Sequence, residues 1–134
     1  MSFDDKHRAS HGLTINSGIR NLLGRPFVYC SRDGEVIKTI APDYEAAKVS
    51  RDPGESREMY GMPVDVFSVP THVDLPCVDG EPIIVSLEVA QAMRHLGKKR
   101  PGQTFSPQHL VMRDGVALGS PGLILHSDLL WVAP

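Results

Sequence analysis

The sequence predicts a mainly β fold with some α+β character, a small antiparallel sandwich or open barrel built from hairpins. Glycine (12 residues) and proline (11 residues) are spread along the 134-residue chain, as many turns between short strands require. Three Asp-Gly pairs, at 33–34, 79–80 and 114–115, each separate two β-prone runs. Asp-Gly is a preferred pair for type I′ hairpin turns. We therefore expect hairpins at all three pairs.

The first residues predict an arm followed by a short helix. Residues 1–12 are charged and polar without a repeating apolar face, so we expect an N-terminal arm outside a single domain at 13–134. Asn16 or Ser17 is placed to cap a helix of about two turns, and Gly24 would end it. The apolar residues expected along one face of this helix are Ile19, Leu22 and Leu23.

Strand-like runs occupy most of the rest of the chain. We expect strands at 27–30, 36–40, 64–69, 73–78, 82–85, 110–112, 116–118, 123–125 and 129–132. Between them, residues 43–61 are polar, and the stretch from Arg51 to Arg57 has no apolar anchor. The sequence therefore predicts a long loop, which in a compact domain is usually functional or ordered by a partner.

A second helix is predicted near residues 86–97. Ser86 is placed to cap it and Gly97 to end it. Its apolar stripe would consist of Leu87, Val89, Ala90, Met93 and Leu96. The basic triplet 98–100 follows at once, where cations complement the negative end of the helix dipole.

Composition excludes several classes of function. The formal net charge of −2 argues against nucleic acid as a partner, because a large electrostatic grip on phosphates needs excess positive charge. Cys30 and Cys77 are too few for a disulfide framework, and we interpret both as reduced core thiols. The longest apolar runs fall far short of the roughly 18 residues that span a bilayer. The polar N-terminus resembles no secretory signal, so we expect no membrane partner and cytoplasmic synthesis.

Catalytic and metal-binding motifs are missing. His7 and His11 lie four apart in the polar arm, which we interpret as a chance pair. His72, Asp74 and Cys77 form a loose cluster, but strand alternation would place His72 and Cys77 on opposite faces. Phosphate-cradling loops and hydrolase elbows do not occur. The remaining internal histidines are interpreted as packing or surface residues: His95, His109 and His126. We therefore expect no enzyme, no cofactor and no metal.

The order of features in the first 60 residues resembles that of small tailed-phage virion proteins. A polar start, a short amphipathic helix ending in the run 22–29, an Asp-Gly hairpin and a charged loop follow one another, as in head-tail joining and decoration proteins. The helix at 86–97 has no counterpart in the simplest joining proteins. The resemblance implies a homo-oligomeric, non-enzymatic assembly protein of a virion-like particle, a head-tail connector or capsid accessory that contacts portal, capsid or tail subunits. Its final location would be the virion.

The arm and the long loop would make those contacts, because both carry charges but no core of their own. The expected partner-binding residues are Phe3, Asp4, Asp5, Lys6 and Arg8 in the arm and Arg51, Asp52, Glu55, Arg57 and Glu58 in the loop. Two alternatives stay open. One is a regulatory or inhibitory binding module for a host protein complex, using residues 43–58, and the other is a small thiol hydrolase that pairs Cys77 with His72 or another histidine.

Overall fold

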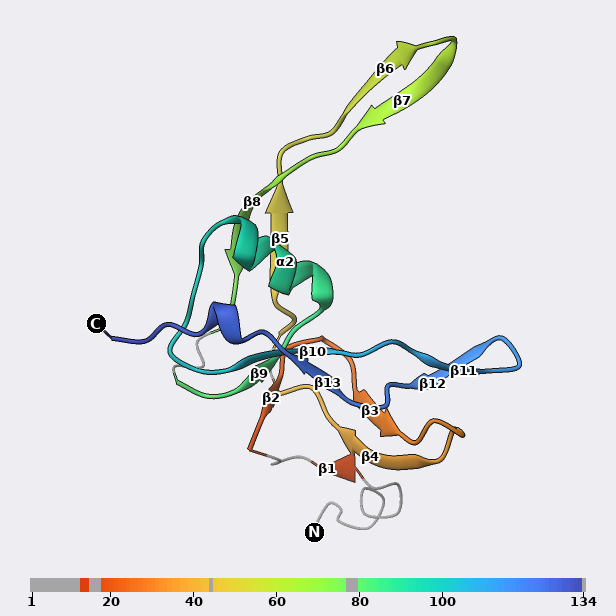
Figure 1. Cartoon of the computed structure of the whole chain (residues 1–134), viewed down its shortest axis with the longest axis vertical. Coiled ribbons are helices and arrows are strands. Elements are labelled where there is room, and N and C mark those ends of the chain that lie inside the picture. Colours follow the sequence, from red (N-terminus) through yellow and green to blue (C-terminus); the bar gives the residue numbers. More distant parts are fainter. Residues whose placement is uncertain (1–12, 15–17, 44, 77–79, 134) are drawn as a thin grey trace.

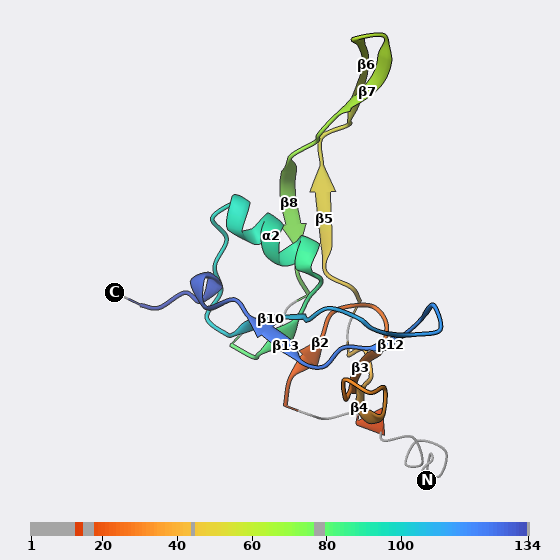
Figure 2. The same ribbon diagram turned by 45° about the vertical axis from the view of Figure 1, so that its right-hand side comes forward.

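A computed structural model describes residues 13–14, 18–43, 45–76 and 80–133. They form a mainly β fold, as predicted, made of several small sheets that do not close into a barrel. Figures 1 and 2 show a body of short strands from which one long two-stranded arm projects. The predicted N-terminal arm, residues 1–12, lies outside the described residues.

A four-stranded sheet lies at the centre of the body. Its strand order is β13 (Leu123–Leu125), β10 (Thr104–Pro107), β9 (Ile83–Ile84) and β2 (Arg20–Asn21). β9 runs parallel to both β10 and β2, and β13 is antiparallel to β10. Because β9 is paired on both edges and covered on both faces, residues 83–85 are fully buried.

The short helix predicted before Gly24 is wrong, because this segment contains strand β2. The backbone N–H groups of Arg20 and Leu22 donate to carbonyls of the segment around β9, at 2.8 and 2.9 Å. Leu22 enters one hydrophobic cluster, whereas Ile19 and Leu23 pack against the other, as strand alternation requires. A two-turn helix gains little by itself. Pairing with β9 instead satisfies main-chain groups in the buried interior.

Two of the three predicted Asp-Gly hairpins are confirmed. β3 (Phe27–Cys30) pairs antiparallel with β4 (Val36–Ile40), and β11 (Val111–Arg113) pairs with β12 (Val116–Gly119). A further short strand, β1 (Leu13–Thr14), runs parallel to β4. The 114–115 turn has positive φ at both residues, +53° and +78°, as a type I′ turn requires. In the 33–34 turn the glycine has positive φ and the aspartate does not.

The predicted hairpin around Asp79-Gly80 is wrong, although Asp79 itself lies outside the described residues. The strand before it, β8 (Pro70–Asp74), pairs with β5 (Lys48–Arg51), and the strand after it is the central β9. The run 82–85 is continuously apolar rather than alternating, which is typical of a strand buried on both faces.

The closing strand predicted at 129–132 is also wrong. A 3₁₀ turn, η1 (Ser127–Leu129), places Leu129 in the core. Leu130 then makes a single bridge to Arg100, and the chain continues outside any sheet.

The second predicted helix is confirmed as α2 (Leu87–His95). The Ser86 hydroxyl accepts a hydrogen bond from the Val89 N–H at 3.2 Å, which caps the helix. Its buried residues are Val89, Ala90, Ala92 and Met93. The ends of the predicted stripe, Leu87 and Leu96, are exposed, because α2 buries one narrow face against the sheets.

Arg100 of the basic triplet has a structural role that the sequence did not predict. Its buried guanidinium donates to the carbonyl of Glu81 at 2.6 Å and to that of Gln103 at 3.0 Å. Lys98 Nζ donates to the carbonyl of Val73 at 3.4 Å. Two of the three cations therefore satisfy main-chain carbonyls beyond the helix end.

We expect Gly102→Ala to lower the free energy of unfolding by about 1–3 kcal/mol, the usual cost of overpacking. A Cβ at Gly102 would lie 2.5 Å from the carbonyl oxygen of Glu81. Gly54→Ala is the matched control, since its nearest neighbour lies 3.9 Å away. The control should be neutral or stabilise by up to about 1 kcal/mol through the unfolded state. Urea denaturation of both variants checks this, and equal losses would contradict the packing described.

Candidate interaction site on a projecting hairpin

The long loop predicted at 43–61 is wrong, because most of it is a β arm. β5 pairs antiparallel with β8 at the root of the arm, and β6 (Glu55–Met59) pairs with β7 (Met62–Val66) beyond it. Figures 1 and 2 show this β6–β7 hairpin extending away from the body. β6 has a polar sequence that is typical of a loop, but the backbone groups on one of its edges pair with β7. The strand predicted at 64–69 is confirmed only for 64–66, the end of β7, and residues 67–69 connect β7 to β8 outside any strand.

The tip of the hairpin is a tight two-residue turn. Tyr60 and Gly61 have φ values of +55° and +76°, which match a type I′ turn. The Tyr60 side chain is 90% exposed. A tyrosine with positive φ is uncommon, so a large aromatic ring is presented at the outermost point of the arm at a conformational cost.

The two faces of the hairpin differ in chemistry. Residues directly opposite each other in an antiparallel pair share a face. One face therefore carries the pairs Met59–Met62, Arg57–Val64 and Glu55–Val66, and the other carries Ser56–Asp65 and Glu58–Pro63. We call the first the apolar face, defined by Met59, Met62, Val64 and Val66. All residues of β6 and β7 are exposed except Val64, which is half-buried, so the described chain leaves this face open.

Arg51 anchors the root of the hairpin. Its guanidinium donates to the carbonyl of Ser68 at 2.7 Å and to Glu88 Oε2, on α2, at 3.1 Å. It also lies over the ring of Phe67, 5.6 Å from the centroid, and that ring is 78% exposed. One side chain thus links both strands of the arm to the helix.

The structure places the five predicted loop residues along this arm. Arg51 is at the root, and Asp52 is exposed between β5 and β6. Glu55 and Arg57 form an ion pair of 2.9 Å on the apolar face, and Glu58 is exposed on the polar face. The apolar residues between and beyond them were missed: Met59, Tyr60, Met62, Val66 and Phe67. The alternation Val64-Asp65-Val66, which predicted a strand, was also the available signal that this strand has one apolar face.

Several predicted features lie outside the described residues. They are the predicted helix caps Asn16 and Ser17, the histidines His7 and His11, the thiol of Cys77, and the predicted contact residues of the N-terminal segment, Phe3, Asp4, Asp5, Lys6 and Arg8. Cys30 is a free, buried thiol. Among the residues that are described, no three His, Cys, Asp or Glu side chains gather as a metal site, and no helix is long and apolar enough to cross a bilayer.

A second polar cluster was not predicted from the sequence. His126, which is 7% exposed, lies with Nε2 at 2.8 Å from Ser106 Oγ and Nδ1 at 3.0 Å from the Arg94 guanidinium. Arg94 also binds both carboxylate oxygens of Asp128, at 2.5 and 2.9 Å. The order Ser–His–Arg–Asp therefore links β10, η1 and α2.

The hydrogen bond between His126 and Ser106 runs in the wrong direction for a nucleophilic serine. Arginine has no acceptor, so His126 Nδ1 must accept, which places the proton of the neutral ring on Nε2. Nε2–H then donates to Ser106 Oγ, whereas a general base would have to accept the serine proton there. Ser106 is also fully buried. The arrangement holds η1 against the sheet rather than activating a hydroxyl.

Burial and, secondarily, the Arg94 guanidinium lower the pKa of His126, and the Arg94 hydrogen bond lowers the pKa of Asp128 to about 2. The unfolded chain therefore binds the His126 proton more readily than the folded chain. We expect the free energy of unfolding to fall as pH drops below about 6.5, the ordinary histidine value.

His126→Gln should weaken this pH dependence between pH 7.5 and pH 5, measured by urea denaturation at several pH values. His109→Gln is the matched control, because the His109 side chain is exposed. An unchanged slope in His126→Gln would contradict the role assigned to the buried ring.

Comparison with known proteins gives no family for this chain. Neither a family model, nor a curated protein, nor a solved structure matches it. The site must therefore be interpreted from its own geometry.

Proposed function

We propose that this chain is a non-enzymatic assembly protein of a virion-like particle, of the head-tail connector or capsid accessory kind. It binds copies of itself, and through them other structural proteins of the particle, with the β6–β7 hairpin as its main contact. Of the features that carried the resemblance, the polar start of the sequence and the Asp33-Gly34 hairpin of β3 and β4 support the class of protein. The short helix and the charged loop do not support it, because the structure has β2 and the strands β5 and β6 in their place. The β6–β7 hairpin supports the mode of binding.

The observation that carries the proposal is the open apolar face. An isolated two-stranded hairpin is marginally stable in water and needs another layer packed on its apolar side. Here Met59, Met62 and Val66 are all exposed, and the aromatic side chains of Tyr60 at the tip and Phe67 near the root are exposed as well. Contiguous exposed apolar surface rimmed by polar residues is typical of protein–protein contact sites. A neighbouring molecule would supply the missing layer.

The polar residues of the hairpin fit the same function. Glu55, Glu58 and Asp65 carry negative charge against the single positive charge of Arg57. Charges around an apolar patch contribute more to the choice and orientation of a partner than to affinity. The buried orientation of Ser106 and His126 likewise favours a non-enzymatic protein.

The test is the double variant Val64→Thr/Val66→Thr, which keeps β-branched shape but adds hydroxyls to the apolar face. Burying an unpaired hydroxyl costs about 1–3 kcal/mol. We therefore expect self-association of this variant to be weaker by at least about tenfold, measured by native mass spectrometry and analytical ultracentrifugation of the full chain.

Ser56→Thr is the control, because Ser56 is uncharged and lies on the polar face, so this variant adds a β-branched residue to the hairpin without changing its charge or its apolar face. Its oligomers should match those of the unaltered chain. An unaltered chain that stays monomeric up to high concentration, or equal effects of the double variant and the control, would overturn the proposal. Stoichiometric capture of one host protein by a monomer would instead select a regulatory binding module.

A further inference from the structure

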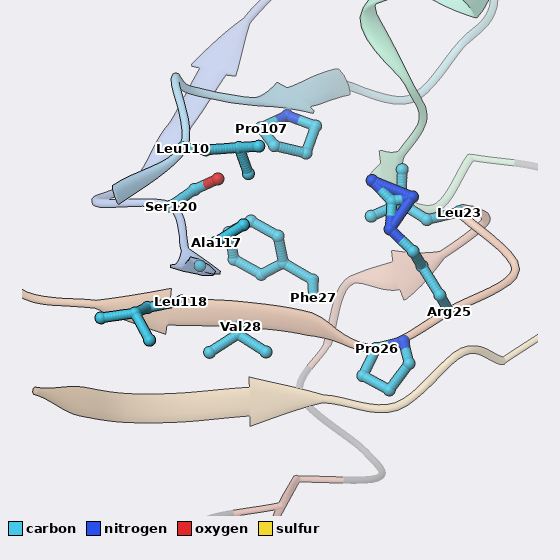
Figure 3. A pocket seen from close by; sticks show the side chains of 11 residues that line it. Leu23, Arg25, Pro26, Phe27, Val28, Pro107, Leu110, Ala117, Leu118 and Ser120 are labelled. Atoms are coloured by element: carbon cyan, nitrogen blue, oxygen red, sulfur yellow. The ribbon is translucent and has the colours of Figure 1, made fainter. Parts of the chain in front are cut away.

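A hollow of about 190 Å³ lies between β3 and β12. These strands belong to the part of the body that is distant from the tip of the β6–β7 hairpin (Figure 1). Figure 3 shows the Phe27 ring at its centre, with Pro107 and Leu110 on one side and Ala117 beside the ring. Leu23 and Arg25 line a further side, to the right in this view. The lining is mostly apolar, and Arg25 is its one charged side chain.

We propose that this hollow receives the Tyr60 ring of a second copy of the chain. The inference rests on the proposed function and names the surface that the hairpin tip binds. Tip and hollow would then join copies head to tail.

The size and chemistry of the two surfaces match. An enclosed protein cavity of about 150 Å³ can hold a benzene ring, so about 190 Å³ of partly open space suits a phenol ring. Tyrosine has an apolar body and a polar end, and the Arg25 guanidinium can lie against such a ring or donate a hydrogen bond to its hydroxyl oxygen. Arg25 is exposed and so free to adjust to the incoming ring.

The charges also match. The hairpin carries three carboxylates against one guanidinium, and the single charge that lines the hollow is positive. Opposite charges at the hairpin and the hollow favour their encounter. Two hairpins carry the same net negative charge, which disfavours pairing of one hairpin with another.

The hollow is preformed, because hydrogen bonds within the chain hold its walls together. The Ser120 N–H donates to the Val28 carbonyl at 2.9 Å, and the Cys30 N–H donates to the Ser120 carbonyl at 3.0 Å, which holds β12 against β3. A Cβ at Gly119 would lie 2.5 Å from the Val28 oxygen, so glycine permits this close approach. A preformed hollow costs little ordering on binding.

The geometry demands a second molecule. Figures 1 and 2 show the hairpin tip at one end of the longest axis and the β3–β12 region toward the other, so the chain cannot insert its own tip. Because tip and hollow are different surfaces, the contact is heterologous, and repeated contacts of this kind build rings or filaments.

The experiment mixes two variants that are each defective in one surface. Tyr60→Asn removes the ring, and asparagine is favoured in the first position of a type I′ turn, so the hairpin is retained. Ala117→Trp fills the hollow from the exposed side of β12. Val116→Trp is the matched control, because Val116 is exposed on the same strand but does not line the hollow. Thermal unfolding verifies that each variant is folded.

We expect native mass spectrometry to show that Tyr60→Asn and Ala117→Trp are each monomeric, with self-association weaker by at least tenfold. Their mixture should form 1:1 heterodimers and nothing larger, since each pair has one intact tip in one intact hollow. Val116→Trp should assemble like the unaltered chain.

Two results would overturn the inference. If Ala117→Trp assembles normally while Tyr60→Asn does not, the tip binds elsewhere and hairpin-mediated assembly stands. If Tyr60→Asn assembles normally, the ring is not the inserted group. The Val64→Thr/Val66→Thr variant distinguishes failure of this inference from failure of the proposed function. If the hairpin makes no contact between copies, that variant also assembles normally.

Discussion

The structure depends on residues 83–85, the segment that joins the central sheet to both hydrophobic clusters. Its backbone pairs in parallel with β2 on one edge and β10 on the other. Its side chains alternate between two hydrophobic clusters. Ile83 and Val85 enter the cluster beneath α2, and Ile84 enters the cluster of Phe27 and Ile40. Burying each such side chain contributes about 1.5–3 kcal/mol, so one short strand stabilises both cores.

The position of the hairpin follows from this centre. Ser86 caps α2 directly after the central strand, and α2 then lies against the β5–β8 root of the arm. The Arg51–Glu88 ion pair, at 3.1 Å, joins the root to the helix. The body therefore covers the arm only at its root, and the β6–β7 hairpin extends beyond anything the described chain can pack on it. Rigid support at the root and an open apolar face beyond it are what an intermolecular contact requires.

Local signals in the sequence predicted the elements with local causes. Asp114-Gly115 predicted its type I′ turn, and Ser86 predicted its cap, because both depend on neighbouring residues alone. The wrong predictions concern segments whose structure depends on pairing with strands that are distant in the sequence. The segment at Leu22 has helical spacing, but β9 binds its backbone. The polar residues of 55–59 predicted a loop, because a strand that is exposed on both faces lacks the alternation of buried and exposed residues that identifies a strand. The sequence names the charged residues of the projecting hairpin as contact residues, and this stays a prediction. It does not indicate the apolar face, because that face forms only when β6 and β7 pair in register.

If another copy of this chain covers the β6–β7 hairpin, as we propose, the amides of the hairpin become protected when copies associate. Amide hydrogen exchange of the unaltered protein at increasing concentration measures this protection. We expect the exchange of residues 55–66 to slow as concentration rises, while the already buried segment 83–85 is unaffected. Exchange in 55–66 that stays fast and independent of concentration would show that no second copy covers the hairpin.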